Sequence, residues 1–117
     1  MPHEERDLAR MWDMLDASRR IVEFTAGMTW EEYCGDELTR LAIERLIHIV
    51  GEAARAVSKQ GQARYSEIPW PKIIAQRNVI IHQYGDIIQQ KLWDVATTEI
   101  PRLISQLEAI LPPPPQP

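Results

Sequence analysis

A chain of 117 residues is long enough to bury the core of one domain. Its 44% hydrophobic and 26% charged residues suit a globular protein, and no apolar run approaches the roughly 18 uncharged residues that a membrane-spanning helix needs. The net charge of -4 argues against a broad nucleic-acid-binding surface, although a local basic cleft remains compatible with it.

The first predicted element is an amphipathic helix that ends near Gly27, a suitable C-terminal glycine. Its apolar side chains recur at helical spacing: Leu8, Met11, Trp12, Leu15 and Val22. Charged residues fill its other faces, namely Asp7, Arg10, Asp13 and Arg20. Thr29 stands three residues before Glu32, which is the spacing of a capping box. This spacing predicts a short second helix over about residues 30–34.

A long helix should follow, because Gly35 interrupts the short helix and Asp36 can cap the next one. We expect it to continue to about Lys59. Its apolar stripe consists of Leu38, Leu41, Ala42, Leu46, Ile49, Val50, Ala53 and Val57. The following string GQARYSEIPWP is predicted to be a connector, since its two prolines hold the backbone extended and Pro71 suits the first turn of a new helix.

The third long helix begins at Pro71, carries the string RNVIIHQYGD and ends near Gly85. Asp86 can then cap a fourth helix, which Pro101 should kink or divide near Glu99. The apolar positions of this fourth helix are Ile87, Ile88, Leu92, Trp93, Ala96, Leu103, Leu107 and Ile110. The sequence therefore predicts an all-α fold, an antiparallel up-and-down four-helix bundle with a short extra helix. We expect one domain over residues 1–111 and a proline-rich tail over 112–117.

The remaining signals limit the chemistry. The single cysteine, Cys34, cannot form an internal disulfide, and three widely separated histidines make no metal-ligand cluster, so we expect neither a metal nor a cofactor. Cys34 is expected to be a small buried residue rather than a nucleophile. The opening MPHEERDLAR carries charges where a secretory signal would have an apolar core, which predicts a cytosolic protein.

The string RNVIIHQYGD places polar groups around an aliphatic run. Asn78 and His82 are four residues apart and share a helical face, so the amide could hold the imidazole in one orientation. Arg77 lies about 140° around the helix from His82, and its long side chain could still reach the same groove. An imidazole that moves protons and a guanidinium that binds phosphate could together cleave RNA without a metal. Spacing alone is weak evidence, because an Arg and a His five residues apart on a helix are common.

The surrounding phrases are more specific. The string R-N-x-x-x-H-x-Y follows an I-P-W connector and is preceded by IVGEAARAVS. In this order the phrases resemble the HepT branch of the HEPN superfamily, the toxin half of a prokaryotic toxin-antitoxin pair. The resemblance extends from the first helix through FTAGMTWEEYCGDELTRLAIERLIHIVGEAA to LWDVATTEIPRLISQLEAIL, and only the proline-rich tail lies outside it.

The resemblance implies a metal-independent endoribonuclease toxin of a type VII pair. It further implies a homodimer, or a higher assembly with the antitoxin, in which both protomers supply Arg and His to a shared cleft. By similarity Arg77 and His82 are the catalytic residues, and Asn78 supports them. Tyr84 corresponds to the tyrosine to which a cognate MNT-type nucleotidyltransferase antitoxin adds AMP. The implied partners are therefore RNA, the antitoxin and a second copy of the chain.

Two other interpretations remain open at this point. A non-catalytic HEPN module could bind RNA or a nucleotide, or dock a nucleotidyltransferase, and composition alone supports only a helical interaction protein. A polar stripe on the second long helix has two interpretations of its own; it comprises Arg45, His48, Glu52 and Arg55. It is either a solvated face, or part of it, Arg45 and Glu52 foremost, faces the cleft or dimer seam beside Arg77.

Overall fold

The computed structural model describes residues 3–82 and 86–112, with side chains for 3–76 and 88–112. Helices joined by short turns account for the described ranges, which contain no strand, and this confirms the predicted all-α class. In chain order the elements are α1 (His3–Thr25), α2 (Trp30–Cys34), α3 (Glu37–Ala56), α4 (Lys59–Arg64), α5 (Trp70–His82), α6 (Asp86–Asp94), the π-helical turn η1 (Val95–Glu99) and α7 (Ile100–Ile110).

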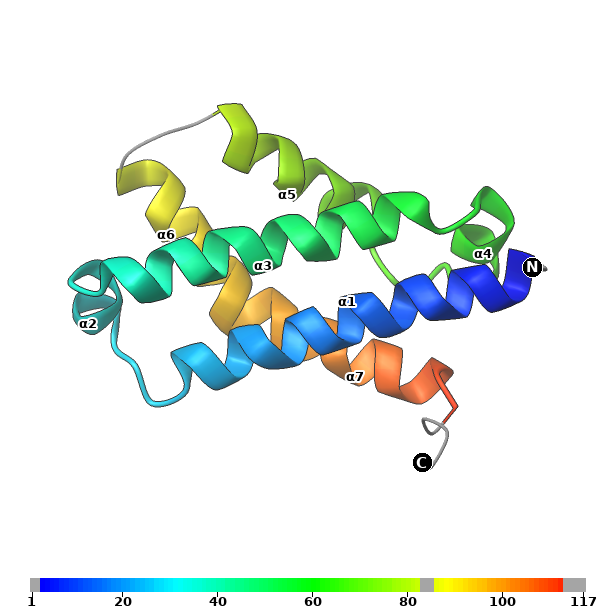
Figure 1. Ribbon diagram of the computed structural model, residues 1–117, viewed down its shortest axis with the longest axis horizontal. Coiled ribbons are helices and arrows are strands. Elements are labelled where there is room, and N and C mark those ends of the chain that lie inside the picture. Colours follow the sequence, from blue (N-terminus) through cyan, green and yellow to red (C-terminus); the bar gives the residue numbers. More distant parts are fainter. Residues whose placement is uncertain (1–2, 83–85, 113–117) are drawn as a thin grey trace.

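Four long elements form the body of the molecule (Figure 1). Helices α1 and α3 run antiparallel side by side, α5 packs against α3, and the succession of α6, η1 and α7 crosses behind them. The core between these elements is made mainly of aliphatic and methionine side chains, joined by Tyr33 and Trp70. Its most deeply buried members include Met11, Met14, Leu15, Ile21, Ile43, Ile47, Leu92 and Leu107. Within the described part of the chain, no helix is both long and apolar enough to cross a membrane.

The helix starts that the sequence predicts around α2 and α3 are confirmed. The Thr29 hydroxyl accepts a hydrogen bond from the Glu32 amide at 3.1 Å, and the Glu32 carboxylate accepts one from the Thr29 amide at 2.9 Å. The Asp36 carboxylate accepts bonds from the backbone amide and the hydroxyl of Thr39, at 3.0 and 2.8 Å. These bonds favour the charged carboxylate and lower the pKa of Asp36. Gly27 has a φ of 72°, the left-handed conformation expected after α1.

An additional helix, α4, lies where the sequence predicts the end of the long helix, near Lys59, and the first residues of the connector. Helix α3 ends at Ala56, and Ser58 caps α4 by accepting a hydrogen bond from the Gly61 amide at 3.0 Å. The carboxylate of Asp7, predicted to be on a solvated face of α1, is buried here instead. It accepts bonds from the Ser58 amide at 2.8 Å and from the Ser58 hydroxyl at 2.5 Å, which ties α4 to the start of α1.

Four burial assignments from the sequence are wrong. Leu38 and Leu41 are 81% and 54% exposed, because α3 turns its Ile43 and Ile47 side of the helix toward the core. Val22 is also exposed. Cys34, predicted to be buried, is exposed because the neighbouring Tyr33 is the side chain that α2 inserts into the core.

The predicted break in the last long helix is confirmed as a π-helical turn. The Ile100 amide donates to the Val95 carbonyl, five residues earlier, rather than to the fourth. This wider turn makes room for the ring of Pro101, which in a regular α-helix would collide with the carbonyl four residues before it. Five of the eight apolar positions predicted for this helix are buried, namely Ile88, Leu92, Ala96, Leu103 and Leu107; Trp93 and Ile110 are partly buried, and the side chain of Ile87 lies outside the described part of the structure.

Candidate functional site

Helix α5 carries three of the four predicted site residues. Arg77, Asn78 and His82 belong to its helical backbone, with His82 as the last residue. Their side chains lie outside the described part of the structure, and so do all of Tyr84 and the predicted helix end at Gly85. Arg77 and His82 therefore lie on a helix, as the sequence predicts. That their side chains reach a common cleft stays a prediction.

The N-terminal half of α5 is firmly anchored. Trp70 is buried, and its indole nitrogen donates to the Tyr65 carbonyl at 3.0 Å. Ile68 and Ile73 are also buried on either side of it. The connector that precedes α5 is thus not a loose loop but a packed segment that fixes where the helix begins.

A second anchor lies immediately before Arg77. The Gln76 side-chain amide donates to a carboxylate oxygen of Glu99 at 3.0 Å, and Lys72 forms an ion pair with the same carboxylate. Glu99 is the last residue of η1, so the π-helical turn delivers this carboxylate to α5. The segment that carries the predicted catalytic pair is therefore tied to α3 by packing and to η1 by polar contacts.

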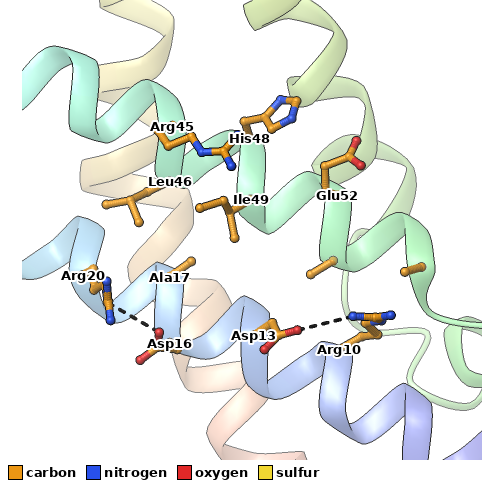
Figure 2. Close-up of a pocket in the computed structure, with 12 residues that line it drawn as sticks. Arg10, Asp13, Asp16, Ala17, Arg20, Arg45, Leu46, His48, Ile49 and Glu52 are labelled. Carbon is orange, nitrogen blue, oxygen red and sulfur yellow. Dashed lines mark ion pairs between the residues drawn. The ribbon is translucent and has the colours of Figure 1, made fainter.

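A groove of about 590 Å³ lies between α1 and α3 (Figure 2). Charged and polar side chains dominate its walls: Arg10, Asp13, Asp16 and Arg20 from α1, and Arg45, His48 and Glu52 from α3. Three members of the polar stripe seen in the sequence thus line one cavity, while Arg55 does not. Below, we call this cavity the α1–α3 groove.

The charges of the α1–α3 groove are only partly neutralised within it. Arg10 pairs with Asp13 at 3.8 Å and Arg20 with Asp16 at 3.5 Å, both along α1. Glu52 has an interaction of its own. Arg45, by contrast, makes no hydrogen bond or ion pair with the described residues and is exposed. The α3 wall therefore holds an uncompensated guanidinium.

The tyrosines differ in accessibility. Tyr33 is fully buried in a cluster with Trp30 and Trp93, and its hydroxyl donates to Gln89 at 3.0 Å. Burial raises the pKa of Tyr33 well above its usual range. Tyr65 is half-buried on the α4 side of the molecule. Neither ring lines the α1–α3 groove.

Metal ligation finds no support in the described ranges, where no three His, Cys, Asp or Glu side chains gather as a metal site would require. The acidic residues of the α1–α3 groove do not form such a group, and two of them pair with arginines. The chemistry that this part of the chain offers is that of guanidinium, imidazole and carboxylate groups.

Sequence comparisons address the family. The profile of the family described as "Ribonuclease HepT-like" matches residues 14–110, which include all four predicted site residues. A protein of Methanocaldococcus jannaschii provisionally named RNase MJ1380 is 27% identical over 91% of this chain and 98% of its own length. Another from the same organism, provisionally named RNase MJ0125, is 30% identical over 92% of this chain and 93% of its own.

A third relative comes from Thermococcus cleftensis and is provisionally named ribonuclease HepT. It is 30% identical over 84% of this chain and 89% of its own length. No solved structure matches the chain significantly. Because the family profile covers most of the chain and full-length relatives agree with it, the chain belongs to the HepT-like ribonuclease family.

Proposed function

We propose that this protein is an endoribonuclease that cleaves RNA without a metal ion, with Arg77 and His82 as its catalytic residues. The observation that carries the proposal is the match to the HepT-like ribonuclease family across residues 14–110. The helical setting of both residues on α5 supports it, as do the two anchors that hold this helix in place.

The proposed reaction is an internal transesterification. One His82 removes the proton from a ribose 2′-hydroxyl, and the 2′ oxygen attacks the neighbouring phosphorus. The bond to the 5′ oxygen breaks, and the partner subunit's His82 supplies the proton that this leaving oxygen takes up. The products are a 2′,3′-cyclic phosphate and a 5′-hydroxyl. Arg77 stabilises the negative charge that builds on the phosphorus oxygens, and Asn78 orients the imidazole.

Two imidazoles in one site require two chains, since each chain has one His82. We therefore propose a homodimer in which the C-terminal halves of two α5 helices face a shared cleft. This arrangement removes the difficulty that Arg77 and His82 lie about 140° apart on their own helix. Each phosphate would meet groups from both protomers.

A cleavage assay tests the activity. Wild type and His82→Ala are incubated with total cellular RNA in the presence of EDTA, and the ends of the fragments are analysed chemically. Wild type should produce cyclic-phosphate ends, and loss of general acid-base catalysis should slow His82→Ala by about 10²- to 10⁴-fold. Equal rates for the two proteins would contradict the role of His82. If neither protein cleaves any RNA pool, the non-catalytic binding module becomes the better interpretation.

We further propose that the protein is a toxin that a nucleotidyltransferase antitoxin neutralises by adding AMP to Tyr84. A nucleotide on this residue would bring bulk and a phosphodiester charge close to Arg77, where it would compete with RNA. The structure disfavours Tyr33 as the target, because its hydroxyl is buried and bonded to Gln89.

This modification can be tested with the nucleotidyltransferase encoded beside the gene. After incubation with that enzyme and ATP, peptide mass spectrometry should find one or more AMP units on Tyr84, and Tyr84→Phe should remain unmodified and active. The modified wild type should lose its cleavage activity. AMP found on Tyr65 instead, with Tyr84 unchanged, would refute the assignment.

A further inference from the structure

The α3 wall of the α1–α3 groove has the chemistry of a phosphate-binding surface. Arg45 and His48 are one helical turn apart on it, and both side chains line the cavity (Figure 2). Neither has a hydrogen bond or ion pair with another described residue. An exposed guanidinium without an internal partner is free to engage a ligand without first giving up a salt bridge.

Three arginines and three carboxylates line the groove, so its formal charges balance, and what stands out is the single arginine without a partner among the described residues, Arg45. The two α1 arginines that line the groove, Arg10 and Arg20, are each engaged by an aspartate on the same helix, and Glu52 has an interaction of its own. On a protein whose net charge is -4, the result is a confined basic position rather than a basic face. Such a position suits a ligand with regularly spaced negative charges that needs only a few contacts.

Helix α3 connects the groove to the proposed catalytic helix. It packs against both α1 and α5, and the residues that line the groove come from α1 and α3 alone. In Figure 2, His48 and Glu52 extend from α3 away from the arginines and aspartates of α1. An RNA strand held at α5 would have to cross α3 to place a neighbouring phosphate at the groove.

We propose that Arg45 binds a phosphate of the RNA strand outside the scissile position, so that the α1–α3 groove is part of the path of the substrate. His48 lies beside it as a second polar contact to the RNA backbone. This inference rests on the proposed function. The competing occupant is a second copy of the chain, since Leu38 and Leu41 are exposed on the same helix. Six of the twelve residues that line the groove are charged and a seventh is His48, which favours the charged ligand.

The test measures how RNA binding depends on salt. In a His82→Ala background, which prevents cleavage, the dissociation constant of a short fluorescent single-stranded RNA is measured over a series of salt concentrations. Arg45→Ala should weaken binding about tenfold at low salt, the loss expected for one charge-assisted contact. It should also reduce the slope of log K against log salt by about 0.7, the contribution of one phosphate contact in a single strand.

Two matched variants separate a local contact from a change in total charge. Arg55 is also exposed, belongs to the same helix and has no ion pair among the described residues, but it does not line the groove. Arg55→Ala should therefore leave the salt slope unchanged. Arg45→Lys keeps the charge, so it should retain most of the slope even if it binds more weakly. Equal effects of Arg45→Ala and Arg55→Ala would overturn the proposal.

Sedimentation of the same variants tests the competing occupant. Arg45→Ala should sediment with the same mass as wild type, whereas a lower mass would identify the groove as a contact between copies and overturn the RNA assignment.

The cleavage assay distinguishes failure of this inference from failure of the proposed function. If wild type binds RNA through Arg45 but never cuts it, the nuclease proposal fails and this inference stands; if it cuts and the slope is insensitive to Arg45, only this inference fails.

Discussion

At the scale of single residues, Asp7 shows how a charged side chain can be structural. Its position in the amphipathic pattern of α1 predicts a solvated carboxylate, yet it is buried and accepts two hydrogen bonds from Ser58. A buried carboxylate is tolerated when its bonds are satisfied in this way. The contact links residues 51 positions apart, so local spacing cannot reveal it.

Gly61 lies directly against the Asp7 carboxylate, so substituting it tests whether this contact stabilises the fold. A Cβ atom there would overlap a carboxylate oxygen of Asp7 and would lie 3.0 Å from a methyl group of Val57. Asp7 cannot move away without losing its bonds to Ser58. Gly61→Ala should therefore lower the free energy of unfolding by about 1–3 kcal/mol, despite the better helix propensity of alanine. Urea denaturation followed by far-UV circular dichroism measures this change.

Gly35 provides the control for this prediction. Its φ of -86° suits any residue, and an added Cβ would make only ordinary contacts of 3.6 and 3.8 Å with backbone oxygens. Gly35→Ala should leave the stability unchanged or raise it by up to about 1 kcal/mol. If both glycine variants are equally stable, the close approach of Gly61 to Asp7 does not constrain the fold.

At the scale of elements, helix starts and breaks were predictable because their causes are local. The reciprocal bonds of Thr29 and Glu32, and the bonds that Asp36 accepts from Thr39, join residues three apart in the chain. Pro101 likewise imposes the π-helical turn on its own helix. Where a few neighbouring residues decide the conformation, their spacing is sufficient information.

Which side of a helix is buried was less predictable, because the neighbouring helices decide it. The first half of α3 is apolar on several sides, so periodicity cannot choose between the side with Leu38 and Leu41 and the side with Ile43 and Ile47. Packing against α1 and α5 makes the choice. Helix α4 was missed although its cap bond, from the Gly61 amide to Ser58, is local, because glycine is a poor helix former and the contact that buries this cap comes from Asp7 at the start of α1.

The candidate site, too, was predictable only where its features depend on residues close together in the sequence. The string RNVIIHQYGD, its position on a helix and the polar stripe of α3 could be identified from the sequence. The α1 wall of the groove could not, because its arginines and aspartates have the spacing of any solvated helix face. Only the antiparallel packing of α1 on α3 brings the two sets of charges to one cavity.

At the scale of the whole molecule, a net charge of -4 is compatible with RNA as a ligand only if binding is local. The pairing of two α1 arginines with aspartates limits the positive potential of the α1–α3 groove to its α3 wall. A second copy of the chain would double the number of such walls around one RNA strand. Dimerisation would thus raise both the number of phosphate contacts and the number of catalytic groups.

A mixing experiment tests whether two chains build one site. Arg77→Ala and His82→Ala are each expected to be nearly inactive as homodimers. If the cleft is shared, a hybrid dimer retains one arginine and one histidine, contributed by different chains. Cleavage by a refolded mixture should therefore exceed that of either variant alone, because general acid-base catalysis contributes about 10²- to 10⁴-fold and is partly restored in the hybrid.

The control for this experiment is the double variant, Arg77→Ala with His82→Ala, refolded together with His82→Ala. Its hybrids contain no histidine at the site, so the mixture should stay inactive. Differential tagging and sedimentation confirm that hybrids form in both mixtures. Activity that remains absent in the first mixture, although hybrids are present, would mean that one arginine and one histidine from different chains do not suffice. Either both imidazoles are then indispensable, or each chain supplies its own pair, which would require Arg77 and His82 to approach each other along a single α5, against their azimuths on a regular helix.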